Sequence, residues 1–449
     1  MLCFLWAMIL YDGYLGPAGE APIDTQQFAL QSVDRQLRLS DGFETRPAPL
    51  RWLAGASTHQ DALDRAVLQL DDVRNLNTTI QIDGRISSRS LMDEHGSTVY
   101  SILLTAAGKN DLARQNLPAP QSLEGRILDA TLTDRMPTDA DLAGLSHLLE
   151  TDDACWWHLA LARSHQTHPG IPAAIERQEK RSEHLANLAL LGRGAVWLLV
   201  LIGALAAPRG LRLLARGLTR KSTGYPKSWP LNLALGVFLV CELGCSEIPR
   251  LIAFLPGASH FSSFFAQITI GSAARLGFAA LACAFLFHRP RHAWRCFGGG
   301  EPVPWRALLG VFTLMFVAQE GLHLLLAPWI PIDPTGGVDS TQAGVTGLAA
   351  LLVSACLVAP IGEELLYRGV LFQGLSNRLG NLAAAILSAL MFTIVHFYGL
   401  YGTISVGILG VALALIYQST RSLKAVIAFH AIYNLTVTLP DWIVHHSEF

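Results

Sequence analysis

Charged residues are scarce in this chain of 449 residues. They make up 15% of the sequence, whereas proteins average about 25%. Hydrophobic residues make up 51%, a balance that excludes an ordinary soluble protein and is typical of a membrane protein. The scarcity is uneven, because residues 12–187 hold 25 acidic against 16 basic side chains and residues 188–449 hold 10 against 17. We therefore expect a soluble first part and an embedded second part.

Cysteines are few as well, with seven scattered along the chain. Only Cys155 lies well inside the soluble part, which excludes a disulfide framework there. Clusters of basic residues interleaved with aromatic ones are missing, so we expect no nucleic-acid partner.

The chain begins with a short apolar stretch, residues 2–11. A membrane-spanning helix needs about 20 residues, and the basic region that opens a signal peptide is missing. We interpret residues 1–19 as a signal-like or signal-anchor segment.

Residues 20–187 alternate polar loops with amphipathic runs. Apolar residues recur there at spacings of three and four, as in 61–74 and 155–164. This period indicates helices, and strand-like alternation is scarce. We expect a soluble helical domain.

Eight apolar stretches follow as candidate spans: 186–207, 231–255, 263–287, 306–329, 345–368, 381–398, 402–418 and 425–443. The loop 208–229 holds six basic residues and no acid, so the positive-inside rule places it in the cytoplasm. The loop 331–344 holds two aspartates and no base, as expected outside, and residues 20–187 fall outside too. The fold class is therefore all-α, a polytopic transmembrane bundle of about eight spans with an N-terminal soluble helical domain. Residues 188–344 are expected to form accessory helices and 345–443 the core.

The most informative motif is EELLYRG at residues 363–369, inside the fifth apolar stretch. One acid at a bilayer centre costs roughly 3 kcal/mol even on insertion-based scales, so an adjacent pair predicts function. Residues four apart share a helix face, so Glu364 and Arg368 are expected to form an internal ion pair. Glu363 has no such partner and is predicted to be a free carboxylate. Pro360 is expected to kink the helix and leave a carbonyl group available.

A histidine in the next apolar stretch lies at the depth of Glu363. Glu363 precedes Gly380 by 17 residues and His396 follows it by 16, on antiparallel helices. Both therefore lie roughly 25 Å of helix axis from the turn. Phe392, one turn before His396, is predicted to pack behind its ring.

The last apolar stretch adds His430 and Asn434 on one helix face. They follow Lys424 by six and ten residues, a depth of about 9–15 Å. This is shallower than Glu363, although a kinked or oblique helix would reduce the difference.

Together these polar groups predict hydrolysis. A carboxylate in a pocket of low dielectric constant can act as a general base on water, and His396 can share that proton. An amide and an imidazole donor suit an oxyanion. We expect Glu363 and His396 to face His430 and Asn434 across a cavity.

The three motifs, Glu-Glu-x-x-x-Arg, Phe-x-x-x-His and His-x-x-x-Asn, resemble in this order those of the CPBP intramembrane proteases. These are the Abi-type relatives of the type II CAAX prenyl endopeptidase, and the resemblance covers about 345–440. It implies an intramembrane endopeptidase in which the following residues act. Glu363, assisted by His396, would activate water, and His430 with Asn434 would form the oxyanion site. The supporting residues would be Glu364, Arg368 and Phe392.

The family has also been described as metal-dependent. We prefer a mechanism without cofactor, because amides such as that of Asn434 are poor zinc ligands. If a metal is required, the expected zinc ligands are Glu363, His396 and His430.

The sequence also supports expectations about partners and location. Membrane lipid and a peptide or membrane-protein substrate are expected, and residues 20–187 could bind an extracytoplasmic partner. The signal-like start indicates a bacterial inner membrane. Two other functions use similar polar groups: a non-proteolytic scaffold or immunity protein, and a proton-coupled carrier, because membrane carboxylates and histidines also mark ion pathways.

Overall fold

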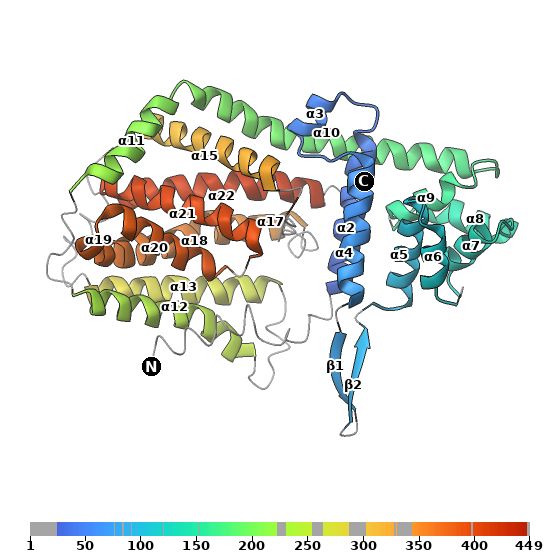
Figure 1. The fold of residues 1–449 in the computed structure, drawn as a ribbon, viewed down its shortest axis with the longest axis horizontal. Helices are drawn as coiled ribbons and strands as arrows, with labels where there is room; N and C mark the ends of the chain where they lie inside the picture. The colour runs from blue at the N-terminus through green and yellow to red at the C-terminus, as the bar shows by residue number, and fades with distance from the viewer. Residues whose placement is uncertain are drawn as a thin grey trace. The chain divides into compact units, whose positions relative to one another are not determined.

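The computed structural model describes residues 25–75, 77–82, 85–90, 92–119, 121–151, 153–221, 230–253, 264–286, 302–326, 329, 344–396 and 398–446. It divides into two units between Ala195 and Val196 (Figure 1). The N-terminal unit is the described part of 18–195 together with 443–446, and the membrane unit is the described part of 196–442. The signal-like segment expected at 1–19 lies outside the described residues.

The N-terminal unit is built from short helices around an apolar core. Four helix starts are capped by side chains that accept a hydrogen bond from a backbone N–H three residues later: Thr58, Asp93, Ser122 and Thr138. The helices are α2 (Thr25–Gly42), α3 (Ala48–Leu53), α4 (His59–Asn75), α5 (Glu94–Ala106), α6 (Asn110–Asn116), α7 (Leu123–Leu132), α8 (Asp139–Leu148), α9 (Trp156–Arg163) and the first part of α10 (Ile171–Ala204).

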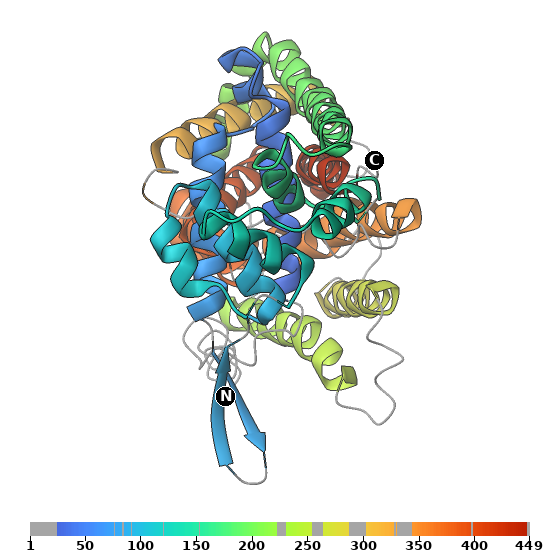
Figure 2. The ribbon, with the colours of Figure 1, turned by 90° about the vertical axis from the view of Figure 1, so that its right-hand side faces the viewer.

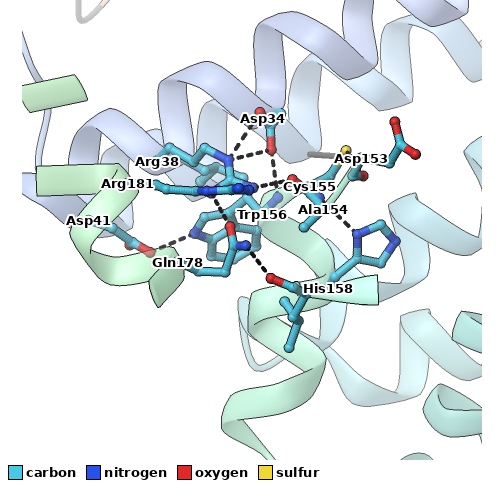
Figure 3. Close-up of polar contacts among 12 residues, drawn as sticks. Asp34, Arg38, Asp41, Asp153, Ala154, Cys155, Trp156, His158, Gln178 and Arg181 are labelled. Atoms are coloured by element: carbon cyan, nitrogen blue, oxygen red, sulfur yellow. Dashed lines mark hydrogen bonds and ion pairs between the residues drawn. The ribbon is translucent and has the colours of Figure 1, made fainter. Parts of the chain in front are cut away.

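A buried arginine ties three segments of this unit together (Figure 3). Arg38 is 1% exposed, and its Nε donates to Asp34 Oδ1 at 3.0 Å. Its other nitrogens donate to Gln178 Oε1 at 2.9 Å and to the carbonyl of Ala154. The Trp156 backbone N–H donates to the same Asp34. Every polar group of the cluster thus gains a partner, as burial requires.

The N-terminal unit also contains one antiparallel hairpin, β1 (Asn77–Ile82) with β2 (Arg85–Ser90), which projects from the helices in both views (Figures 1 and 2). This hairpin is an addition to the expected helical domain. Ile82 pairs with Arg85, so only Asp83-Gly84 separates the strands. Asp-Gly is a strong hairpin signal, and together with the alternation around it could have revealed the hairpin.

The membrane unit is all-helical where it is described. Its helices are the end of α10, α11 (Ala207–Thr219), α12 (Leu231–Ala253), α13 (Phe264–Leu286), α15 (Trp305–Leu326), α17 (Gly344–Val353), η2 (Ser354–Val358), α18 (Ala359–Glu363), η3 (Glu364–Phe372), α19 (Gln373–Leu379), α20 (Asn381–Ile394), α21 (Leu400–Thr420) and α22 (Leu423–His446). Here η denotes a π-helical segment. Helices α17 to α19 form one continuous helical stretch, Gly344–Leu379.

Six helical stretches among the described residues are long and apolar enough to cross a membrane: Ile171–Ala204, Phe264–Ala284, Trp305–Leu326, Gly344–Leu379, Leu400–Thr420 and Leu423–Val444. Two shorter apolar helices, Leu231–Cys245 and Asn381–Ile394, fall in the other two expected ranges. The all-α polytopic fold is thereby confirmed. The number of complete crossings stays approximate.

Candidate active site

The helix that carries the acidic pair is interrupted by π-helical turns on both sides of α18. Pro360 lies five residues after Ala355, the spacing of a π-helical hydrogen bond, and has no N–H to donate. The Asn434 side chain on α22 supplies the missing donor, with Nδ2 at 2.7 Å from the Ala355 carbonyl oxygen. The expected free carbonyl therefore exists, and Asn434 binds it. One amide hydrogen of Asn434 remains for another acceptor.

Glu364 lies in a buried polar network. Glu364 and Arg368 are both fully buried, and their Oε1 and Nη1 atoms are 3.1 Å apart, so the expected ion pair is confirmed. Arg368 Nη2 donates to the Gly410 carbonyl of α21 at 3.0 Å. His430 Nδ1 on α22 lies 2.7 Å from Glu364 Oε1. Because an ion-paired carboxylate accepts, Nδ1 donates this hydrogen bond.

Glu363 is the more accessible acid of the pair. Its side chain is 14% exposed, against 0% for Glu364. The expectation that it is a free carboxylate is wrong, because Arg275 Nη1 on α13 lies 3.3 Å from its Oε1. On the other side, Oε2 lies 3.9 Å from His430 Nε2. The His430 imidazole thus lies between the two carboxylates. Glu364 is on its Nδ1 side and Glu363 is on its Nε2 side.

His396 lies in the turn after α20 rather than in the span where it was expected. Its Nδ1 donates to the Phe392 carbonyl at 2.6 Å, which leaves Nε2 as the free ring nitrogen. It lies within electrostatic range of Glu363. Phe392 packs edge-on against its ring at 4.8 Å between centroids, as predicted, and Tyr398 stacks on it at 5.6 Å.

Aromatic rings form a wall behind these polar groups. Phe392 contacts His430 as well as His396, with centroids 6.0 Å apart. The Arg368 guanidinium lies 4.6 Å from the Phe392 centroid, and Tyr367 packs edge-on against the same ring at 5.0 Å. A buried charge over an aromatic face gains a cation–π interaction. The wall therefore packs apolar surface against the supporting side of the site.

A family model described as Type II CAAX prenyl endopeptidase Rce1-like matches residues 345–436. These residues hold all three motifs of the sequence analysis. They form an Rce1-like domain. The resemblance to the CPBP family is thereby confirmed. Neither the curated proteins nor the solved structures give a match to the chain.

The surroundings of the Rce1-like domain extend beyond the matched residues. Arg275 comes from α13, and Glu242 of α12 lies within electrostatic range of Glu363, Arg275 and Tyr367. Neither residue was expected at the site from the sequence. The signal that could have found them is a charged residue within an apolar helix, which marks a bundle interior.

Gly362 explains how Arg275 reaches the acid. A Cβ at Gly362 would lie 2.6 Å from Arg275 Cγ, closer than real Cβ contacts allow. The arginine stem therefore lies directly over the glycine that precedes Glu363. Together with the apolar helices, the Rce1-like domain identifies an integral membrane protein.

Proposed function

We propose that the Rce1-like domain is an intramembrane endopeptidase whose general base is Glu363. The observation that carries this proposal is the contrast between the two acids. Glu364 is completely buried and held by Arg368 and His430, whereas Glu363 is partly exposed with two imidazoles within electrostatic range. A base must reach water, and of the two acids only Glu363 has exposed surface.

The reaction follows from these positions. Glu363 takes a proton from water, with His396 Nε2 available to share it, and the hydroxide attacks the peptide carbonyl carbon. The C=O π electrons move onto oxygen, and the resulting oxyanion accepts hydrogen bonds from His430 and from the free amide hydrogen of Asn434. When the oxyanion collapses, the C–N bond breaks and the amine leaves with the proton that was taken from water.

His430 can play its part only in one protonation state. Its Nδ1–H is used by Glu364, so the neutral ring presents a lone pair at Nε2. Donation to an oxyanion therefore requires the doubly protonated ring. The Glu363 and Glu364 carboxylates lie on the two sides of this ring.

We also propose that the reaction needs no metal, because the residues present fit an ion poorly. Arg275 already places a positive charge 3.3 Å from the Glu363 oxygen, and a divalent cation there would be repelled. Within the described residues, no group of three His, Cys, Asp or Glu side chains is arranged to hold a metal ion.

The proposed substrate is a peptide or membrane-protein segment that reaches Glu363 from the lipid phase. The proposed location is a bacterial inner membrane, with the N-terminal unit outside the cytoplasm, where it could bind a partner. The carrier and scaffold functions use the same polar groups without bond cleavage, so the test must detect new peptide termini.

The test compares membrane-protein termini by mass spectrometry in cells that express the wild type or Glu363→Gln. We expect termini that depend on Glu363 and persist in the matched control Glu247→Gln, a carboxylate of α12 outside the site. Identical termini in all three strains would refute proteolysis. Proton-coupled flux in proteoliposomes without cleavage would establish a carrier instead.

A further inference from the structure

Helix α11 has three distinct faces. Its sequence begins with Pro208 in the first turn and continues with helix-favouring Ala, Leu and Arg residues. Gly210, Leu213 and Gly217 are buried on one face. A second face carries three exposed arginines, spaced three and four residues apart: Arg209, Arg212 and Arg216. A third, roughly opposite the arginines, exposes Leu211 and Leu218 at 61% and 44%.

The buried face fixes α11 across one end of the helical bundle. A Cβ at Gly210 would lie 2.5 Å from the Gly310 backbone, near the start of α15. A Cβ at Gly217 would collide with the Leu415 carbonyl, near the end of α21. Asn381, the first residue of α20, donates to the Gly217 carbonyl at 2.9 Å. Helix α11 therefore lies where spans begin and end, at the level of a membrane surface.

The arginine face has no acidic partner in this part of the chain. Between Glu183 and Glu242 the sequence contains seven Arg and Lys residues and no Asp or Glu. In the part of the chain that the structure describes, Arg212 Nε donates only to the Pro208 carbonyl of its own helix. Within the described residues, no ion pair joins Arg209 or Arg216 to an acid. Their charge remains available to an anion from outside the protein.

We propose that α11 is an interfacial helix that binds the phosphate groups of anionic phospholipids. Leu211 and Leu218 reach the acyl region, and Arg209, Arg212 and Arg216 meet the phosphates. An amphipathic helix with leucines on one face and basic residues on the other lies in the interface in this way. A guanidinium also donates to a phosphate through two parallel N–H bonds, which an ammonium does not.

A merely solvated basic face would not account for the leucines. Water on all open sides would leave two large apolar side chains exposed on the opposite face without cover. Placing α11 at the headgroup layer satisfies both faces together. The occupant is therefore a lipid headgroup rather than dissolved phosphate, since only the lipid offers acyl chains beside its charge.

The experiment measures lipid binding to the purified full-length protein in a neutral detergent. Phosphatidylglycerol with a fluorescent acyl chain is titrated, and binding is read by energy transfer from the protein's tryptophans. Unlabelled phosphatidylglycerol should compete well. Unlabelled phosphatidylcholine and inorganic phosphate should compete poorly. Raising the ionic strength from about 0.01 M to about 1 M shortens the Debye length from about 30 Å to about 3 Å and should weaken binding.

The decisive variant changes Arg209, Arg212 and Arg216 to Gln. Each basic residue near an anionic surface contributes about fivefold in affinity, so the triple variant should bind about a hundredfold more weakly. Changing the same three residues to Lys keeps the charge and should retain most of the affinity. A matched control changes three exposed arginines of the N-terminal unit to Gln, at positions Arg65, Arg114 and Arg135, and should bind like the wild type.

Two results would overturn the proposal. One is equal competition by phosphatidylcholine, which would show that the headgroup charge is not recognised. The other is equal loss in the N-terminal control, which would show an effect of net charge alone. If the Gln variant fails to fold, the salt dependence and the lipid competition, both measured on the wild type, still test the proposal. Binding that does not depend on salt would refute it.

Discussion

Arg275 Nη1 lies 3.3 Å from Glu363 Oε1 and joins α13 to the acid proposed as general base. The guanidinium holds the carboxylate from one side, while His430 faces its other oxygen. When one oxygen of a carboxylate is held by a partner, its second oxygen points in a fixed direction. Helices outside the family match therefore contribute to the geometry of the site.

Arg275→Gln should reduce turnover strongly, since a misplacement of about 1 Å can cost on the order of a hundredfold. Arg275→Lys should restore part of the activity. Gly362→Ala provides an independent check, because its new Cβ would displace the arginine stem. The measurement is the rate of peptide cleavage against pH. A uniform loss without any change in the pH profile would show that Arg275 has only a structural role.

The parts of the site that sequence could predict depend on short separations within one helix. Glu364 with Arg368 and Phe392 with His396 are each four residues apart, and helix geometry alone brings them together. His430 and Asn434 share α22 for the same reason. The all-α fold was predictable too, because long apolar stretches allow little else in a membrane.

The remaining contacts depend on how helices rotate against one another. Sequence indicated that His430 lies shallower than the acids, yet its Nδ1 lies 2.7 Å from Glu364. The π-helical turns on both sides of α18 change which face each acid presents. Arg275 is distant in sequence from Glu363, and no local pattern connects them.

The two acids should respond differently to removal. Glu364→Ala leaves the Arg368 charge buried without its partner, a change that costs about 3–5 kcal/mol. Glu363→Ala removes a partly exposed carboxylate and should leave the protein folded but inactive. The thermal midpoint of each purified variant, measured in one detergent, separates the two effects. Equal destabilisation by both substitutions would contradict the division into supporting and catalytic roles.

The hydrogen bond from Asn434 to Ala355 should depend on Pro360. Asn434→Ala leaves a part-buried carbonyl without this donor, at a cost near the lower end of about 1–3 kcal/mol. In a Pro360→Ala background the backbone N–H of residue 360 becomes available, so the same substitution should cost less. A double-mutant cycle of thermal stabilities measures the coupling. Additive effects would show that the proline does not determine this contact.

The N-terminal unit should lose stability in acid through Glu124. Its Oε1 lies 3.1 Å from His158 Nε2, and this hydrogen bond lowers the pKa of Glu124 from 4.5 to about 2. The Cys155 backbone N–H donates to His158 Nδ1, so Nε2 carries the proton that Glu124 accepts.

A lowered carboxyl pKa stabilises the folded state above the unfolded pKa. The gain, about 3 kcal/mol, is therefore present above pH 4.5 and is lost as the pH falls toward 2. Glu124→Gln should flatten the pH dependence of stability in this window. Glu176→Gln changes an exposed acid and should leave most of that pH dependence in place. Hydrogen exchange of α7 and α9 in the full chain measures the effect, because these helices carry the two partners. Equal pH dependence of exchange in Glu124→Gln and the wild type would show that this pair does not control acid stability.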